Sequence, residues 1–98
     1  MSLRFEWDQA KADSNFRKHR VTFETATLVF DDPFVMTEQD RIENGEYRWQ
    51  STGQIPGALL LVVAHVYRDD SGAEVIRIIS ARRAEKRERR RYEQDRSI

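Results

Sequence analysis

The chain has 98 residues, of which 39% are hydrophobic and 35% are charged, and it contains no cysteine. This length gives room for one domain, predicted over residues 1–98, with a composition typical of soluble globular proteins. Disulfide bonds and thiolate metal sites are excluded, and the longest apolar run, residues 58–66, is too short to cross a bilayer. The first residues lack the apolar stretch of a signal peptide, so we expect a cytoplasmic protein without membrane contact.

The formal net charge of zero hides an asymmetric distribution. Residues 82–98 contain eight arginines and lysines against four acidic residues, a local charge of +4, so the other 81 residues carry −4. Such a segment can present a cationic surface to a polyanion. It can equally form a solvated helix whose charges pair with one another, and the charge pattern leaves both interpretations open.

The first third of the chain predicts a short strand followed by two helices. Phe5-Glu6-Trp7 has the pattern of a strand, and Asp8 is a typical N-cap for a helix over residues 9–19. Thr22 is the predicted N-cap of a second helix with apolar residues at helical spacing. Pro33 ends that helix, because its ring disfavours helical geometry at the preceding residue. The two helices are expected to form a hairpin.

After Pro33 the apolar residues alternate, which predicts strands over residues 34–38, 47–54, 58–68 and 74–81. Turns at Pro56-Gly57 and at residues 69–72 join the last three strands into an antiparallel meander. Residues 82–95 predict a final helix with almost no apolar face, which must dock through arginine stems and Tyr92 or wait for a ligand or partner. The whole order predicts an α+β fold, with helices on one face of a small twisted antiparallel sheet and the other face partly free.

Strand alternation then sorts the side chains of the two most regular strands. The residues predicted to face the core are Leu60, Val62, Ala64, Val66, Ile76 and Ile78. The opposite face is predicted to carry His65, Tyr67, Arg77 and Arg83 near the strand ends. A histidine and arginines would therefore meet on the less covered face.

This grouping suits cleavage of RNA without a metal. The ribose 2′-hydroxyl attacks the adjacent phosphorus, so the reaction needs a base, an acid and cations around the phosphate. Histidine titrates near neutral pH and arginine binds phosphate through paired donors. Aromatic residues such as Phe34, Tyr47 and Trp49 can stack on single-stranded bases. A structural His65 and a cross-strand ion pair for Arg77 remain open alternatives.

Motifs for other chemistries are absent from the sequence. It contains no His-Glu-x-x-His metal motif, no glycine-rich phosphate loop and no Gly-x-Ser-x-Gly nucleophile elbow. Nucleotide binding of the Rossmann or P-loop kind is therefore not expected.

Several ordered motifs together resemble the BrnT family of toxins from bacterial type II toxin–antitoxin systems. They include Phe5-Glu6-Trp7-Asp8, Asn15-x-x-Lys18-His19, Val29-Phe30-Asp31-Asp32-Pro33, Glu46-x-Arg48, Gly53, Leu60-x-Val62-Val63-x-His65, and residues 76–84 with Glu88-Arg89 and Tyr92. The likeness spans nearly the whole chain. Arg20 departs from the family, which has a glycine with positive φ at this position, so either Arg20 adopts that conformation or the first helix ends differently.

The resemblance implies a RelE-like fold, ribonuclease activity that inhibits translation, and no cofactor or metal. It also implies a BrnA-like ribbon-helix-helix antitoxin, a heterotetramer with it, and operator DNA binding only through the antitoxin. The predicted catalytic residues are His65, Arg77, Arg82, Arg83 and Tyr92, and the predicted RNA-binding residues are Lys18, His19, Arg48, Trp49, Lys86 and Arg90. The competing hypothesis is a non-catalytic module that binds nucleic acid or protein through its basic C-terminal helix.

Overall fold

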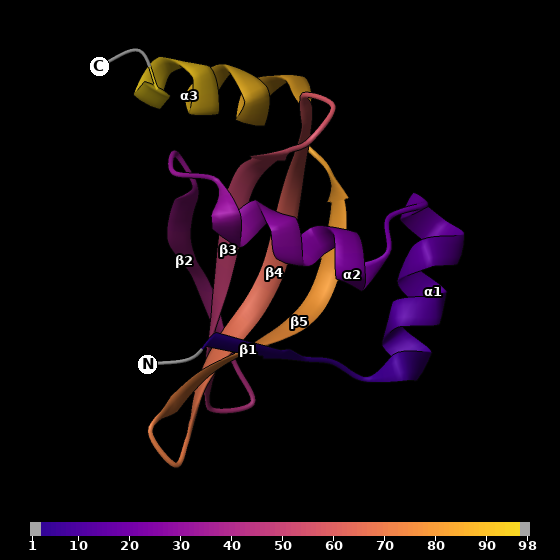
Figure 1. Cartoon of the computed structure of the whole chain (residues 1–98), viewed down its shortest axis with the longest axis vertical. Coiled ribbons are helices and arrows are strands. Elements are labelled where there is room, and N and C mark those ends of the chain that lie inside the picture. The colour runs from indigo at the N-terminus through magenta and orange to yellow at the C-terminus, as the bar shows by residue number, and fades with distance from the viewer. Residues whose placement is uncertain (1–2, 97–98) are drawn as a thin grey trace.

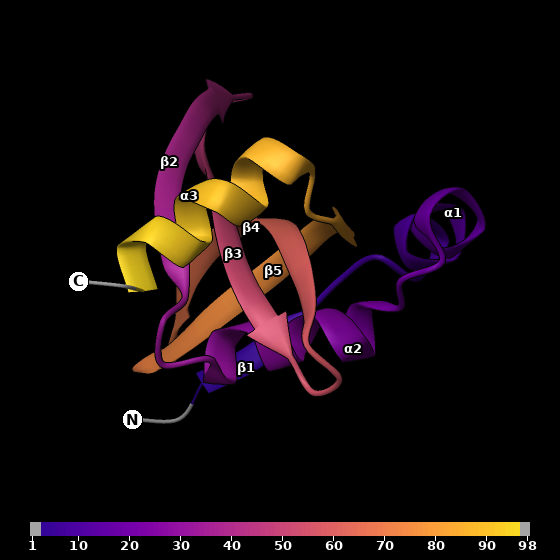
Figure 2. The ribbon, with the colours of Figure 1, turned by 90° about the horizontal axis from the view of Figure 1, so that it is seen from above.

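A computed structural model of the chain describes residues 3–96; residues 1, 2, 97 and 98, which the predicted domain includes, lie outside the described residues. In chain order the elements are β1 (Leu3–Glu6), α1 (Gln9–His19), α2 (Phe23–Ala26), the 3-10 helix η1 (Thr27–Asp31), β2 (Met36–Glu43), β3 (Glu46–Ile55), β4 (Leu59–Asp70), β5 (Ala73–Arg83) and α3 (Lys86–Arg96). The strands form one sheet in the order β1-β5-β4-β3-β2 (Figure 1). Seen from above, α3 crosses one end of this sheet (Figure 2). No helix among the described residues has the length and apolar character needed to span a membrane.

The α+β class is confirmed, but the sheet is mixed rather than wholly antiparallel. β2 to β5 form an antiparallel meander, whereas β1 pairs with β5 in parallel. The helical segments α1 and α2–η1 separate β1 from β2 along the chain, so these two strands need not be neighbours. β1 lies at one edge of the sheet beside β5, and β2 lies at the other edge. β5 also continues through Arg82 and Arg83, which the sequence predicts to begin the last helix. Their pairing with Val62 and Leu61 keeps them in the strand, so α3 begins only at Lys86.

Both predicted N-caps of the first two helices are confirmed. The Asp8 carboxylate accepts a hydrogen bond from the Lys11 backbone N–H at 3.2 Å. The Thr22 hydroxyl oxygen accepts one from the Thr25 N–H at 3.1 Å. These caps satisfy amide donors that a helix cannot satisfy internally. α1 has the predicted bounds, while the second helix is one α-helical turn that tightens into η1 and ends before Pro33.

The C-terminal end of α1 is fixed by backbone geometry and by a buried amide. Arg20 adopts the left-handed conformation, with φ of 61°, and its N–H donates to the Phe16 carbonyl. This conformation costs a non-glycine residue about 1 kcal/mol. The buried Asn15 side chain donates to the carbonyls of Val21 (3.2 Å) and Ala81 (2.8 Å) and accepts from the Ala81 N–H (3.1 Å). Asn15 thereby ties α1 to the end of β5.

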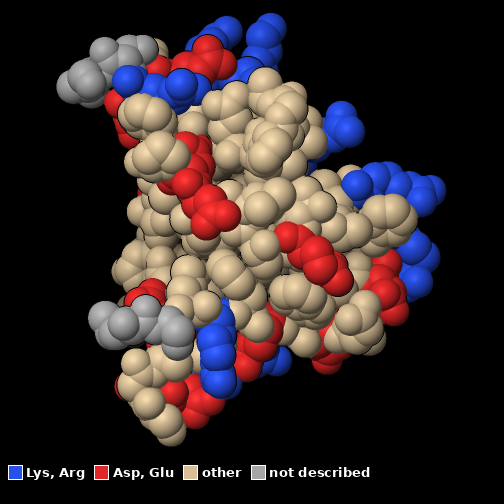
Figure 3. All heavy atoms as spheres, in the orientation of Figure 1, with Lys and Arg blue, Asp and Glu red and all other residues tan. Residues whose placement is uncertain are grey.

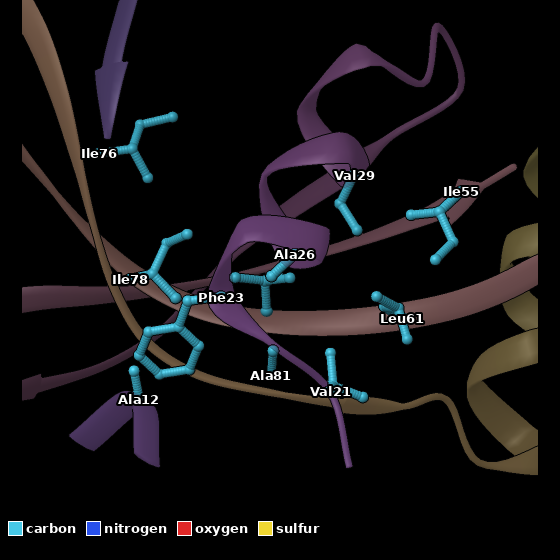
Figure 4. Close-up of a cluster of buried hydrophobic side chains, with 11 residues drawn as sticks. Ala12, Val21, Phe23, Ala26, Val29, Ile55, Leu61, Ile76, Ile78 and Ala81 are labelled. Atoms are coloured by element: carbon cyan, nitrogen blue, oxygen red, sulfur yellow. The ribbon is translucent and has the colours of Figure 1, made fainter. Parts of the chain in front are cut away.

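The core lies between the sheet and the helical segments α1 and α2–η1 (Figure 4). Phe23, Ala26 and Val29 point from α2–η1 onto the strands and are fully buried. Leu61 and Ile78 meet them from β4 and β5 (Figure 4). The predicted pairing of Ile76 and Ile78 with Leu60, Val62, Ala64 and Val66 is wrong, because those four residues of β4 face the other side. β4 is apolar on both faces, so its alternation could not show which face carries the core.

A β-bulge at Ile79 changes the alternation within β5. Ala64 pairs with Ser80 and His65 pairs with Ile78, which leaves Ile79 as the extra residue. Even-numbered residues of β5 face the core before the bulge, and odd-numbered residues face it afterwards. Ile78 and Ala81 therefore both belong to the core.

The α2–η1 segment lies so close to β3 that only glycine fits at position 53. A Cβ atom there would lie 2.8 Å from the Val29 Cγ1 and 2.9 Å from the Val29 carbonyl oxygen. The carbonyl belongs to the backbone and cannot move aside as a side-chain tip can. Gly53 therefore permits the close packing of η1 on the sheet.

α3 is held mainly by polar contacts. Tyr92, its one buried residue within the described helix, is 2% exposed, and its hydroxyl donates to the Asp32 carboxylate at 2.5 Å. The same carboxylate accepts from the backbone N–H groups of Phe34 (2.9 Å) and Gln54 (2.7 Å). Burial alone would raise the pKa of Asp32, but the hydrogen bonds from Gln54, Tyr92 and Phe34 lower it. One carboxylate thus joins η1, β3 and α3, and the predicted docking through Tyr92 is confirmed.

The Tyr92→Phe variant tests this anchor, because it removes the hydroxyl and keeps the ring. We expect the free energy of unfolding to fall by about 1.5–3 kcal/mol, the range for a hydrogen bond to a charged group. Tyr47→Phe, at an exposed ring, should change it by no more than about 0.5 kcal/mol. Urea denaturation measures both variants, and equal midpoints would contradict the anchoring role of Tyr92.

Candidate functional site

The histidine and the arginine expected to meet on one face lie on opposite faces of the sheet. His65 pairs with Ile78 on the core side, whereas Arg77 pairs with Val66 on the other side. The cause is the two-residue turn at Ser71-Gly72, where both residues have positive φ. Between this turn and the bulge at Ile79, odd-numbered residues of β4 therefore pair with even-numbered residues of β5. The predicted His65–Arg77 site is therefore wrong, and the turn was the sequence signal that could have corrected it.

His65 lies inside the protein. It is fully buried, and its Nε2 lies 2.7 Å from the Ser51 Oγ, which in turn lies 2.7 Å from the Thr37 Oγ1. The rings of Phe30 and Tyr67 stand edge-on to the imidazole, with centroids 5.0 and 5.1 Å away. Burial lowers the pKa of His65 to about 4, so the ring is neutral at neutral pH. Its burial contradicts the predicted contact with RNA and favours the structural alternative.

The opposite face of the sheet brings together arginines from β3 and β5. We call it the arginine face, defined by Arg48, Arg77 and Arg82 with Gln50, Ala64 and Ser80 between them. Arg77 pairs with Val66, and Arg82 pairs with Val62. The bulge at Ile79 is what brings Arg82 onto the same face as Arg77. All six side chains are partly exposed, so the face can be reached by a ligand.

Gln50 and Ser80 of this face are not among the residues that the sequence predicts for the site. Gln50, Ala64 and Ser80 form one row across the sheet, between the row of Arg77 and the row of Arg82. Gln50 lies two residues after Arg48 in β3, so strand alternation alone predicts that the two side chains share a face. Ser80 could not be placed without the bulge.

The three arginines of the face differ in how far their donors are satisfied. Arg48 is 16% exposed, its Nε is buried without a hydrogen-bond partner, and its Nη2 lies 3.6 Å from the Glu43 carboxylate. Arg82 instead makes a two-point contact, in which its Nη1 and Nη2 donate to the two Glu88 oxygens at 2.8 and 2.9 Å. Arg77 pairs in the ladder with Glu6, whose carboxylate accepts two hydrogen bonds from Arg68. Arg48 thus has a buried donor without a partner, whereas both terminal nitrogens of Arg82 are already hydrogen-bonded to Glu88.

The remaining candidate residues lie away from this arrangement. Arg83 pairs with Leu61 and so has the opposite orientation from Arg82. Trp49 lies on the core side, edge-on to Tyr67 with ring centroids 5.6 Å apart. Burial and the hydrogen bond to Asp32 raise the pKa of Tyr92 to about 12, so its hydroxyl is already engaged. Arg83, Trp49 and Tyr92 therefore do not join the arginine face, contrary to the predicted site.

The other basic candidates lie on two separated helices. Lys86 and Arg90 are exposed on α3, the helix that contacts the arginine face through the Glu88–Arg82 pair. Lys18 and His19 lie at the end of α1, which both ribbon views place apart from α3 (Figures 1 and 2). On the helix side of the molecule, lysines and arginines gather over α3 and α1, and uncharged and acidic residues cover the middle (Figure 3). Among residues 3–96, no three His, Asp or Glu side chains are grouped as metal ligands.

Comparison with known proteins adds a family to this geometry. The family model described as ribonuclease toxin, BrnT, of type II toxin-antitoxin system matches residues 7–88. The crystal structure of the Brucella abortus ribonuclease toxin BrnT is similar, with a TM-score of 0.58 and 19% sequence identity over 88% of this chain and 100% of that chain. Identity this low supports a common fold only. The search of curated proteins finds no match.

The buried imidazole predicts a pH dependence of stability. The pKa of His65 is about 4 when folded and has its ordinary value of 6.5 when unfolded. Between these values the unfolded chain binds a proton that the folded chain does not. Stability from this residue is therefore complete above pH 6.5 and is lost as the pH falls towards 4, by at most about 3 kcal/mol.

The test compares His65→Gln with His19→Gln by urea denaturation across this pH range. The His65 variant should lose most of the slope of stability against pH, because glutamine does not titrate. The His19 variant should keep it. An unchanged slope in His65→Gln would show that another group causes the acid sensitivity.

Proposed function

Because the chain belongs to the BrnT family of ribonuclease toxins of type II toxin–antitoxin systems, we propose that it cleaves RNA on the arginine face without a metal. We further propose one RelE-like domain over residues 1–98, which acts in the cytoplasm and inhibits translation by destroying RNA. The observation that carries the proposal is the placement of Arg48, Arg77 and Arg82 on one accessible face of the sheet.

Arg48 and Arg77 are the proposed phosphate-binding pair. They extend from β3 and β5, the strands on either side of β4, two strand spacings or roughly 10 Å apart. Long arginine side chains can reach one phosphodiester group from both sides across this distance. The Arg48 Nε is buried without a partner, which is costly in the free protein, and an anion would satisfy it once the side chain turns outward. Val66 and Ala64 between the arginines give an apolar floor that keeps the charges from being fully hydrated.

The proposed chemistry relies on charge stabilisation more than on a histidine. The 2′-hydroxyl attacks phosphorus, so the O2′–P bond of a 2′,3′-cyclic phosphate forms and the P–O5′ bond breaks; the hydroxyl proton passes to water, and water protonates the leaving 5′-oxygen. Extra negative charge develops on the phosphate oxygens in the transition state, where guanidinium donors bind more strongly than in the ground state. His65 is buried, and the only other histidine, His19, lies on α1. Arginines stay protonated over the whole physiological range. Activity is therefore expected to show no inflection from a histidine while the protein remains folded.

Arginine substitutions test the proposed site. Arg77→Gln or Arg48→Gln should lower kcat/KM for cleavage of single-stranded RNA about 100-fold, the usual scale for loss of one donor to a transition-state oxygen. Arg17→Gln, an equal charge change on exposed α1, should leave kcat/KM within a few-fold. Product analysis should find 2′,3′-cyclic phosphate ends, in buffer with EDTA. Full activity of the Arg48→Gln, Arg77→Gln double variant would disprove this assignment.

A second candidate function is non-catalytic binding through α3. Lys86, Arg87 and Arg90 are exposed on this helix and provide a cationic surface that needs no reactive group. This function predicts salt-sensitive RNA binding without any cleaved product. The cleavage assay therefore separates the two functions directly.

The type II classification implies a protein antitoxin, and we propose that it is BrnA-like, with a ribbon-helix-helix segment. Toxin and antitoxin are proposed to form a heterotetramer that binds operator DNA only through the antitoxin. Expression of this chain alone should stop growth, and co-expression of such an antitoxin should restore it. Mass measurement of the co-purified complex should give two copies of each chain. Growth arrest that persists despite a stoichiometric complex would contradict inhibition by this partner.

A further inference from the structure

Arg82 differs from the other arginines of the face because a carboxylate from α3 already occupies its donors. The two Arg82 terminal nitrogens and the two Glu88 oxygens form a two-point contact at 2.8 and 2.9 Å, with both side chains about 30% exposed. The hydrogen bonds from Arg82 lower the pKa of Glu88, and those to Glu88 raise the pKa of Arg82. The pair is charged and well aligned at neutral pH.

This geometry is also the one in which a guanidinium binds a phosphate. Carboxylate and phosphate each present two oxygens at a spacing that matches paired N–H donors. Arg82 lies on the same face as Arg77, further along β5, at a distance of roughly 13–16 Å for this stretch of strand. Glu88 therefore occupies the position that the next phosphates of a bound RNA chain would reach.

We propose that Arg82 is a second phosphate-binding position, that Glu88 occupies it in the free protein, and that RNA along β5 exchanges a phosphate for this carboxylate. The inference rests on the proposed function and specifies its ligand: a single strand long enough to extend from Arg77 to Arg82. A mononucleotide is too short to reach both.

The exchange leaves most of the α3 anchorage in place. Glu88 also accepts a hydrogen bond from the Glu85 backbone N–H at 2.8 Å, so its release affects the first turn of the helix. Further along α3, Tyr92 remains bound to Asp32 and Arg91 to Glu38. Arg96 remains bound to Gln54. Carboxylate displacement can therefore occur without undocking of the whole helix.

The test uses a fluorescent, short single-stranded RNA with 2′-O-methyl sugars, which binds but lacks the hydroxyl needed for cleavage. Glu88→Gln should raise affinity about tenfold at low salt, because Arg82 no longer has to leave a carboxylate. Glutamine still offers an oxygen to the Glu85 N–H and so preserves the helix start. Asp95→Asn removes the same charge from the same helix at a residue that makes no hydrogen bond or ion pair with Arg82, and its effect gives the general contribution of charge.

Arg82→Gln completes the comparison. It should make the slope of log affinity against log salt shallower by about 0.7, the value for one phosphate contact on a single strand. A purely structural role for Arg82 would leave that slope unchanged. In the Arg82→Gln, Glu88→Gln double variant, the extra gain from Glu88→Gln over Asp95→Asn should vanish, because the two residues act as one unit. Thermal melting of each variant confirms that binding is compared between folded proteins.

The outcomes separate this inference from the proposed function. Equal gains from Glu88→Gln and Asp95→Asn, or a Glu88 effect that survives in the Arg82→Gln background, would overturn the exchange while RNA cleavage at Arg48 and Arg77 stands. A mononucleotide whose affinity rises as much as that of the longer strand would overturn the span along β5. Absence of RNA binding by the unaltered protein would overturn both proposals.

Discussion

The register between β4 and β5 is the constraint on which the site depends, because each ladder position decides which face a side chain joins. Two residues of positive φ in the connecting turn pair Asp70 with Ala73, and every pairing up to the bulge follows from that start. His65 is thereby directed into the core and Arg77 out of it. The bulge at Ile79 then reverses the alternation, so that Arg82 joins Arg77 while Ala81 remains buried. A slip of one residue would exchange a buried hydrophobic face for a charged one, which makes the register costly to change.

A second constraint comes from the polarity of α3. A helix with one buried residue cannot be held by apolar area, so its position depends on directed polar contacts. The Asp32 carboxylate supplies the central one, with donors from Tyr92, Gln54 and Phe34. The pairs at Arg82 and Arg91 lie at partly exposed sites, where ion pairs contribute little to stability. The anchor at Asp32 therefore fixes where α3 lies, whereas the outer pairs can respond to an approaching anion.

Local features of the chain could be predicted because they depend on neighbouring residues alone. Asp8 and Thr22 cap helices through amides three residues away, and Gly57 and Gly72 supply positive φ in turns. The order of the predicted elements indicates the α+β class, and the ordered motifs indicate the toxin family that the family model matches. The Ser71-Gly72 turn indicates that His65 shares a face with Ile78, whereas the bulge and the parallel pairing of β1 could not be predicted in this way. Each is a choice between partners distant in sequence, and the apolar run of β4 gave no preference between the two faces.

The division of the titratable groups between the two faces has a consequence for how pH acts on the protein. His65, whose pKa is lowered to about 4 by burial, is enclosed by Ser51, Phe30 and Tyr67 and makes stability depend on pH. The groups proposed to bind the substrate are guanidiniums, which hold their charge, and the hydrogen bonds from Arg82 lower the pKa of the Glu88 carboxyl beside it. Mild acid therefore acts on the folded fraction of the protein rather than on the chemistry of the arginine face. A loss of activity in acid would follow the unfolding curve, and the catalytic rate of the molecules that remain folded would be nearly constant.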